Sequence, residues 1–374
     1  MINSETLEND DRFPVHTIYL VSHLGTKPIG GVEWMMFHVY EILRHHFPRC
    51  KIVILSADTI KTFWLVRFLK FLFLGRSFSI FYPLLYSLFL TMEKMRKKKL
   101  FVISNGFYCP FYEADVVFAH GTFKGFLVSK GYRSSFREKM IDVFEYRSFR
   151  SAKKLIAVSK GVLWELENFY GISERRIAVL ENPVDVDTFQ NQSSALESGD
   201  GRRKVIFVGR VEERKGSALL DKIVDEMDSL GELCICTPLG QKIDPKLLND
   251  NRIKFVYDPP RESIVELLNK AHLFILPSVY EGFSLAVLEA LACGCPVLGL
   301  DENYRYWRCL KEKRQPGVFY SSLETYPKEV ARLMQKDFSL EERRMISESA
   351  KENYNLEKYK LQFLNLVTSA IFQK

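Results

Sequence analysis

Short apolar runs alternate along this chain with longer stretches in which apolar residues recur at helical spacing. Runs of about five residues rich in Val, Ile and Phe, each followed by a helical stretch, are typical of strands in parallel α/β sheets. The first half holds five such runs, at 16–22, 51–55, 100–104, 115–119 and 154–159. The second half holds five more, at 204–209, 232–236, 253–257, 272–276 and 296–300. The pattern therefore predicts an α/β protein with two sheets, each doubly wound.

A polar stretch rich in Gly and Ser separates the two sets of strands. It covers residues 186–203 and is predicted to be a linker or a long surface loop. The chain has 374 residues, enough for two domains of ordinary size. We expect an N-terminal domain over 1–185 and a second domain over 204–352. The remaining stretch, 353–374, has the spacing of an amphipathic helix at 354–372.

Composition indicates where the protein works. The N-terminal sequence MINSETLENDDRF is polar and acidic and lacks the apolar region of a secretory signal, so we expect a cytoplasmic protein. Seven cysteines are an odd number in a chain too large to need disulfide bonds, which favours reduced, mostly buried thiols. Two C-x-C pairs could hold a metal, but no histidine stands beside them at ligand spacing. We expect no metal at these cysteines.

The net charge of +7 is unevenly distributed, and its densest run is KMRKKK at 94–99. The neighbouring aromatic residues form apolar blocks and do not alternate with basic residues, which disfavours nucleic acid as a partner. An anionic membrane surface fits better.

The preceding stretch, 61–92, is strongly apolar. Its runs are too short to span a bilayer, which needs about 20 residues, but Arg67 and Lys70 share one face of a predicted helix. Segment 61–99 is therefore predicted to lie on the membrane; the alternative is a pair of helices buried in the first domain.

Ligands of open α/β sheets bind beyond the carboxyl ends of the strands, so the residues that follow each strand are candidates for chemistry. After the first strand, Gly30 and Gly31 precede a helix that Val32 and Glu33 open. Such glycines allow close approach of a ligand, and the helix amides can bind an anion, although a Gly-Gly pair is also a common turn. The stretch is not G-x-G-x-x-G, which argues against a nicotinamide dinucleotide.

The first strand of the second half leads into FVGRVEERKGS, residues 207–217. Arg210 and Lys215 stand there beside the start of a helix and could clamp a diphosphate through charge-assisted hydrogen bonds. The alternative is a solvated, charged turn.

Another candidate stretch is PSVYEGFSLAVLEALACGCPV, residues 277–297, which carries Glu281 on a loop and Glu289 inside a helix that Ser284 begins. A carboxylate can accept hydrogen bonds from both hydroxyls of a ribose or from a donor sugar. The amides of the helix start can bind phosphate, and they belong to Gly282, Phe283, Ser284 and Leu285.

Three ordered stretches, GGVE at 30–33, FVGRVEERKG at 207–216 and the E-x7-E of 281–289, resemble the motifs of retaining family 4 glycosyltransferases with the GT-B fold. ENPVD at 181–185 is similar to the interdomain element of that family. The resemblance implies two Rossmann-like doubly wound domains that face an interdomain cleft. It also implies a final helix, 353–374, that crosses back to the N-terminal domain.

The resemblance also implies residue roles. Arg210 and Lys215 would hold the donor diphosphate, Glu289 the ribose and Glu281 the donor sugar. His120, in FAHGTF, is similar to the active-site histidine of the family. The sequence departs from the family at CTPLGQ, where only Gly240 remains of a glycine-rich turn.

Asp185 and Asp187 form a literal D-x-D pair, the pattern of metal-dependent glycosyltransferases of another fold. The pair follows ENP at the domain junction, so we interpret Asp185 as structural. We expect no metal requirement and no cofactor apart from the nucleotide-sugar donor substrate.

The implied activity is metal-independent, retaining transfer of a hexose from a nucleotide-diphosphate donor to an acceptor hydroxyl on a lipid-linked or cell-envelope glycan such as lipopolysaccharide or O-antigen. The enzyme would be peripheral at the inner face of the cytoplasmic membrane. The alternatives are a sugar-nucleotide epimerase of the same fold and a catalytically silent, membrane-associated assembly subunit.

Overall fold

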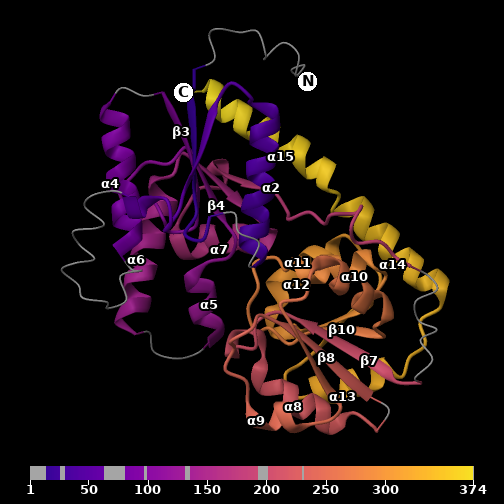
Figure 1. The fold of residues 1–374 in the computed structure, drawn as a ribbon. Helices are drawn as coiled ribbons and strands as arrows, with labels where there is room; N and C mark the ends of the chain where they lie inside the picture. The colour runs from indigo at the N-terminus through magenta and orange to yellow at the C-terminus, as the bar shows by residue number, and fades with distance from the viewer. Residues whose placement is uncertain are drawn as a thin grey trace. The chain divides into compact units, whose positions relative to one another are not determined.

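The computed structural model describes residues 14–25, 30–62, 81–96, 99–130, 135–192, 201–229 and 231–373. The chain divides into two compact units (Figure 1). The first unit comprises residues up to Glu181 together with Lys360–Lys374, and the second comprises Asn182–Tyr359. The division therefore falls at 181/182, close to the junction expected near 185, and the predicted linker at 186–203 belongs to the second unit.

The first unit is built on a parallel sheet with the strand order β2-β1-β3-β4-β5-β6. Its strands are β1 Thr17–Val21, β2 Lys51–Leu55, β3 Leu100–Asn105, β4 Val116–Ala119, β5 Lys154–Ala157 and β6 Ile177–Val179. Its helices are α2 Gly31–His46, η1 Ile60–Thr62, α4 Tyr82–Met95, α5 Phe123–Lys130, α6 Phe136–Ser151, α7 Lys160–Tyr170 and η3 Glu174–Arg176. The chain enters the sheet at β1 and continues to opposite sides, so the topological switch point lies between β1 and β3.

The second unit is built on a parallel sheet with the order β12-β11-β10-β7-β8-β9. Its strands are β7 Arg203–Val208, β8 Gly231–Thr237, β9 Ile253–Tyr257, β10 Leu273–Leu276, β11 Val297–Leu300 and β12 Val318–Ser321. Its helices are η4 Glu213–Lys215, α8 Ser217–Glu226, α9 Pro245–Asn249, α10 Arg261–Lys270, α11 Leu285–Ala292, η5 Asp301–Asn303, α12 Tyr304–Glu312, α13 Tyr326–Met334 and α14 Leu340–Asn353. The last helix, α15 Leu356–Phe372, begins in the second unit and ends in the first.

Each sheet has helices packed on its buried faces. In the second unit, α8 and α13 cover one face and α10 and α11 lie across the other (Figure 1). The core between α8, α13 and the strands contains Leu220, Ile223, Val330 and Leu333, all fully buried. Parallel strands covered on both faces need apolar side chains at almost every position. That requirement explains why the apolar runs predict these strands.

The structure confirms the α/β fold with two doubly wound sheets. All ten predicted strands are present within two residues at either end, and α15 confirms the helix predicted at 354–372. The sequence pattern missed β6 and β12, which lie at the edges of their sheets. They are only partly buried, so their side chains need not form a continuous apolar run.

Local chemistry fixes where several helices begin. Ser135 and Glu138 form a capping box at the start of α6, since each side chain accepts a hydrogen bond from the other residue's amide. Ser339 and Glu342 do the same for α14. A side-chain cap is worth about 0.5–2 kcal/mol.

The apolar segment 61–99 is described only in part. Residues 63–80 and 97–98, which include Arg67 and Lys70, lie outside the described residues, so the predicted interfacial helix there is not described. Its C-terminal part is helix α4, which buries Leu85, Tyr86 and Leu90 in the first unit. For this part, the buried-helix alternative holds. Among the described helices, none combines the length and the apolar character needed to cross a bilayer.

Six of the seven cysteines are buried, Cys50 is half-buried, and none forms a disulfide bond. In the described part of the chain, no three His, Cys, Asp or Glu side chains gather in a metal-binding arrangement.

Candidate active site

The motif residues of the second unit meet at its topological switch point, between β7 and β10. The loop after β7 and the loop after β10 are joined by a hydrogen bond from the amide of Val279 to the carbonyl of Arg214, 3.1 Å long. Gly216 makes this approach possible. It has a φ of +80°, and a Cβ there would lie 2.1 Å from the carbonyl oxygen of Pro277. The two loops therefore form one structural feature at the carboxyl ends of the strands.

Lys215 and Glu281, predicted separately from two motifs, form an ion pair. Lys215 Nζ lies 2.5 Å from Glu281 Oε1, and their side chains are 17% and 8% exposed. Burial acts to raise the pKa of Glu281, but the charges of Lys215 and Arg214 outweigh it and hold the pKa below its usual value. Glu281 is therefore an ionised hydrogen-bond acceptor at neutral pH, with a cation beside it.

Arg210 occupies a different environment from Lys215. Its side chain is 56% exposed and lies 3.7 Å from Glu212, which also pairs with Arg214 at 3.0 Å. The predicted clamp thus consists of one largely buried cation, Lys215, and one exposed cation, Arg210. Such an exposed side chain can move toward a ligand at little cost.

Glu289 lies inside α11 and pairs with Arg261 of α10, with 3.2 Å between Arg261 Nη2 and Glu289 Oε1. Burial raises the pKa of Glu289, against the lowering effect of Arg261, and the negative charge of Asp185 adds to the rise. Arg261 also stacks over the ring of Phe189, 4.7 Å from its centroid. Sequence reasoning missed Arg261, because no motif connects it to Glu289.

Asp185 forms hydrogen bonds with the residues that follow it in the chain. Its carboxylate accepts hydrogen bonds from the amides of Asp187 and Thr188 and, at 2.7 Å, from the Thr188 hydroxyl. Burial acts to raise the pKa of Asp185, but these hydrogen bonds outweigh it and lower the pKa. This geometry is that of a turn-stabilising carboxylate.

The start of α11 offers hydrogen-bond donors. Ser284 is its N-cap residue and makes no side-chain cap, so the first amides of α11, from Leu285 onward, keep the free donors of a helix start. Gly282 and Phe283 lie in the loop immediately before it.

Two buried asparagines lie against the same loop. Asn303 accepts from the Glu281 amide at 3.3 Å, and Asn182 donates to the Phe283 carbonyl at 3.2 Å. Asn303 Nδ2 and Asn182 Oδ1 are buried without a hydrogen-bond partner in the described part of the chain. Buried polar atoms of this kind point to a ligand or water. No sequence motif contains Asn303, whereas Asn182 belongs to the ENPVD stretch.

His120 belongs to the first unit, one residue beyond β4. Its ring stacks on Phe118, with 5.6 Å between the centroids, and its Nε2 is buried and has no partner among the described residues. Burial lowers the pKa of His120 to about 4. The imidazole is therefore neutral at neutral pH, with one nitrogen available to a ligand.

The switch point of the first unit carries an aromatic cluster, which sequence reasoning missed. His23 follows β1 and stacks on Tyr108, which follows β3, with 5.8 Å between the ring centroids. Tyr82 of α4 meets His23 edge-on at 5.0 Å. The Nδ1 atom of His23 is buried and lacks a hydrogen-bond partner in the described residues. This cluster places flat apolar rings where a sheet of this kind binds its ligand.

Gly30 and Gly31 open α2 beside this switch point. Gly30 has an extended backbone, with a φ of −157°, which any residue can adopt. A Cβ at Gly30 would lie 2.9 Å from a carboxylate oxygen of Glu33. Gly30 is therefore the N-cap residue of α2. Its role in ligand binding stays a prediction.

Two doubly wound parallel sheets, with candidate ligand residues at the switch point of each, define a two-domain protein with the GT-B architecture. The family comparisons agree with this class. Residues 188–353 match the model of Glycosyl transferases group 1, and residues 90–188 match the model of Glycosyltransferase Family 4. Together the two models match residues 90–353, which is consistent with a family 4 glycosyltransferase of the GT-B fold.

Relatives and solved structures agree with this assignment. D-inositol 3-phosphate glycosyltransferase of Mycobacteroides abscessus is 28% identical over 170 residues, which cover 42% of this chain and 38% of the relative. N-acetylgalactosamine-N,N'-diacetylbacillosaminyl-diphospho-undecaprenol 4-alpha-N-acetylgalactosaminyltransferase of Campylobacter jejuni is 29% identical over 166 residues, covering 41% and 43%. Anabaena HepE, solved with UDP and glucose, superposes with a TM-score of 0.68 at 13% identity, covering 95% and 100%. This chain therefore spans less than half the length of these two curated relatives, and the solved structure shares its fold.

Proposed function

We propose that this protein transfers a hexose from a nucleotide-diphosphate donor to an acceptor hydroxyl, with retention at the anomeric carbon. The observation that carries the proposal is the Lys215–Glu281 pair at the switch point of the second unit, with the free amides of α11 beside it. A switch point is where doubly wound sheets bind nucleotides. The bound ligands of Anabaena HepE, UDP and glucose, support this donor class.

The roles of the residues follow from their charges. Lys215 and Arg210 supply positive charge to the diphosphate, and the amides of Gly282, Phe283, Ser284 and Leu285 supply neutral donors. Glu281 is ionised and accepts hydrogen bonds from the donor sugar, while Glu289 has one carboxylate oxygen paired with Arg261 and offers the other to the ribose.

Catalysis would come from stabilisation of the negative charge that develops on the leaving diphosphate. A loose, oxocarbenium-like transition state places negative charge on the diphosphate, so the contacts made by Lys215 and the α11 amides strengthen as the bond breaks. His120, in the first unit, would contribute a neutral imidazole, the role that its resemblance to the family's active-site histidine implies. The proposed reaction needs neither a metal ion nor a cofactor other than the donor substrate.

We also propose that the first unit binds the acceptor at the His23 and Tyr108 cluster, since stacked rings suit a sugar face. The acceptor would belong to a lipid-linked or envelope glycan, and the protein would work at the inner face of the cytoplasmic membrane. The Campylobacter jejuni relative, whose name includes diphospho-undecaprenol, supports this acceptor class.

Ligand-induced stabilisation tests the donor site. Thermal unfolding is measured in the presence of UDP, GDP, ADP or CDP. The nucleotide of the donor should raise the stability of the protein, by about 2.7 kcal/mol at 100 times its Kd, more than the others do. A variant with Glu289→Gln should lose most of this effect. If no nucleoside diphosphate stabilises the wild type, the donor assignment is wrong.

Product analysis then separates transfer from epimerisation. A transferase should leave the donor sugar unchanged when no acceptor is present, apart from slow hydrolysis. An epimerase should convert the sugar without an acceptor, and a silent subunit should bind nucleotide without any turnover.

A further inference from the structure

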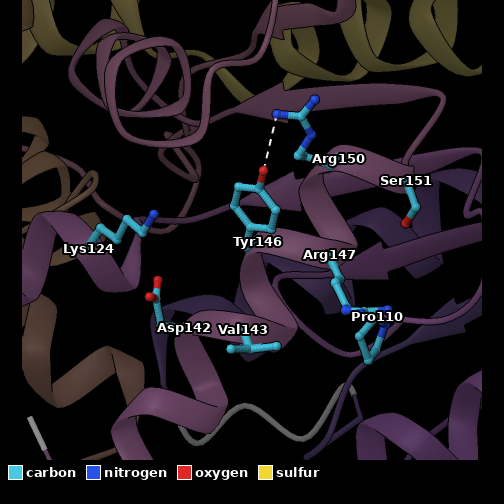
Figure 2. Close-up of a pocket in the computed structure, with 8 residues that line it drawn as sticks. All are labelled: Pro110, Lys124, Asp142, Val143, Tyr146, Arg147, Arg150 and Ser151. Atoms are coloured by element: carbon cyan, nitrogen blue, oxygen red, sulfur yellow. Dashed lines mark hydrogen bonds between the residues drawn. The ribbon is translucent and has the colours of Figure 1, made fainter.

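Helices α5 and α6 of the first unit carry a group of cations that the proposed reaction does not use. Lys124, Arg147 and Arg150 line an open cavity of about 610 Å³ (Figure 2). The other lining residues are Pro110, Asp142, Val143, Tyr146 and Ser151. The lining thus holds three cations and one carboxylate, so the cavity favours an anion.

Aromatic rings and the backbone carbonyl of Phe169, not carboxylates, hold these cations in place. Lys124 Nζ lies 5.4 Å from the ring centroid of Tyr146, and Arg147 stacks 4.8 Å over Phe111. Arg150 donates a hydrogen bond of 3.2 Å to the Tyr146 hydroxyl, which Figure 2 shows as a dashed line. Within the described residues, none of the three cations has a carboxylate ion-pair partner. Their charges are therefore left for an external anion.

The single carboxylate of the cavity, Asp142, interacts electrostatically with Lys124. Asp142 has one buried oxygen without a hydrogen-bond partner in the described chain. Burial raises its pKa, and the charge of Lys124 opposes that rise. In Figure 2 the Asp142 side chain lies below Lys124, away from Arg150.

Exposed apolar side chains accompany the cations on α6. Phe136 is 79% exposed and Val143 is 47% exposed. Positions 136, 143, 147 and 150 are separated by seven, four and three residues, a spacing that places them along one face of a helix. Phe111, which Arg147 covers, is itself 50% exposed. Cations mixed with exposed large apolar residues on one helix face are typical of helices that rest on anionic lipid surfaces.

We propose that this α6 face, defined by Phe136, Val143, Arg147 and Arg150 with Lys124 of α5, docks the protein on an anionic membrane. The cations would bind lipid phosphates and the apolar side chains would enter the head-group layer. The charge of the cavity complements anionic phospholipid, and the exposed Phe136 and Val143 favour a lipid surface over a soluble phosphate. This surface deepens the proposed membrane-linked function and lies outside the 61–99 segment in sequence.

Vesicle sedimentation with the full chain tests the surface. Phosphatidylcholine vesicles with 30% phosphatidylglycerol should bind the protein at low salt, and pure phosphatidylcholine vesicles should not. The Arg147→Gln, Arg150→Gln double variant should bind about thirty-fold more weakly, which corresponds to about 1 kcal/mol for each cation. The Arg147→Lys, Arg150→Lys variant keeps the charge and should retain most of the binding.

Two comparisons make the assignment specific. A Lys222→Gln, Lys328→Gln variant removes the same charge from exposed positions of the second unit and should bind vesicles normally. A Lys97→Gln, Lys98→Gln, Lys99→Gln variant measures the contribution of the basic run at 94–99. If only that triple variant loses binding, the α6 proposal fails.

Soluble anions distinguish a lipid surface from a phosphate pocket. Inorganic phosphate at 50 mM is expected to weaken vesicle binding no more than sodium chloride of equal ionic strength. Phosphate binding that depends on Arg147 and Arg150, without vesicle binding, would overturn the proposal. Nucleotide stabilisation, measured in the same variants, reports separately on the donor site, so failure of one proposal is not mistaken for failure of the other.

Discussion

Lys215 and Glu281 show how one residue pair connects stability with function. Lys215 is held against a largely buried carboxylate, so removing it leaves a negative charge without its partner. Breaking a buried pair in this way costs about 3–5 kcal/mol, and the remaining exposure and nearby Arg214 place the expected loss toward the lower end. The same change removes a donor to the leaving diphosphate.

We therefore expect Lys215→Ala to lower both stability and turnover. Turnover should fall about a hundred- to a thousand-fold, and urea unfolding should show a loss of about 3 kcal/mol. The Lys215→Met, Glu281→Gln double variant should recover most of the stability but none of the turnover. Arg210→Ala is the matched comparison, since its exposed side chain should change stability by only about 0.5 kcal/mol. Near-normal turnover in folded Lys215→Ala would contradict the clamp.

His120 makes stability depend on pH. Its pKa is about 4 in the folded protein, below the value of about 6.5 expected in the unfolded chain. A depressed pKa contributes stability that is present above about pH 6.5 and is lost as the pH falls through about 4. This lowering of the pKa of His120 corresponds to roughly 3 kcal/mol of stability.

We expect the free energy of unfolding to fall between pH 6.5 and 4, and to fall less in His120→Asn. His272 also has a pKa lowered to about 4 by burial and by nearby cations, so it should account for part of the remaining loss. Urea titrations at several pH values, with His272→Asn as the matched variant, measure both terms. A His120 proton titration near pH 6.5 in NMR spectra would disagree with the buried environment.

The hydrogen bonds of Asp185 predict how the activity of the protein responds to chelators. Its oxygens already accept three hydrogen bonds from Asp187 and Thr188, so the turn uses the carboxylate that a D-x-D metal site would need. Activity should persist after dialysis against EDTA. Loss of turnover that magnesium or manganese restores would show that the pair binds a metal.

At the scale of elements, one glycine keeps two loops together. Gly216→Ala would place a methyl group 2.1 Å from the Pro277 carbonyl oxygen in a backbone with a φ of +80°. The loop after β7 must then move away from the loop after β10, which separates Lys215 from Glu281. We expect at least a ten-fold loss of nucleoside diphosphate affinity, measured by calorimetry, together with reduced stability.

Gly201→Ala provides the comparison for that experiment. Gly201 also has a positive φ, +66°, but a Cβ there has no neighbour within 4 Å. Its substitution should cost only the conformational strain of about 1–2 kcal/mol and leave nucleotide affinity unchanged. Equal effects of the two substitutions would show that strain alone, and not the contact with Pro277, matters.

At the scale of the whole molecule, helix α15 completes the core of the first unit from the far end of the chain. Phe363, Val367 and Ile371 are fully buried and recur every four residues. Phe363 packs against Phe118 of β4, with 6.0 Å between the ring centroids. The first unit therefore depends on residues that follow the entire second unit in sequence.

Phe363→Ala should destabilise the first unit by about 3–5 kcal/mol through the cavity it leaves. Leu361→Ala, two residues away and 64% exposed, should change stability by less than about 0.5 kcal/mol. Urea unfolding followed by fluorescence, with nucleotide binding as a separate reporter of the second unit, distinguishes the two. Unchanged stability in Phe363→Ala would show that α15 contributes little to this core.

The sequence by itself determined the strands and the residues that follow them. Buried parallel strands require continuous apolar side chains, so ten of the strands are visible as short runs. The chemistry of such sheets lies just beyond those strands, so Arg210, Lys215 and Glu281 could be selected from local sequence alone. Edge strands β6 and β12 were missed because they are only partly buried and need no continuous apolar run.

Only the tertiary structure decided which of these residues meet. Lys215 and Glu281 are 66 positions apart, and the contact between their loops depends on the packing of Gly216 against Pro277. Arg261 and Asn303 reach the site from other elements, and no local pattern connects them to it. The α6 face likewise joins a lysine of α5 to arginines of α6, because its cations are arranged by aromatic contacts between elements. Such long-range contacts are set by packing within each unit, and a linear pattern does not record them.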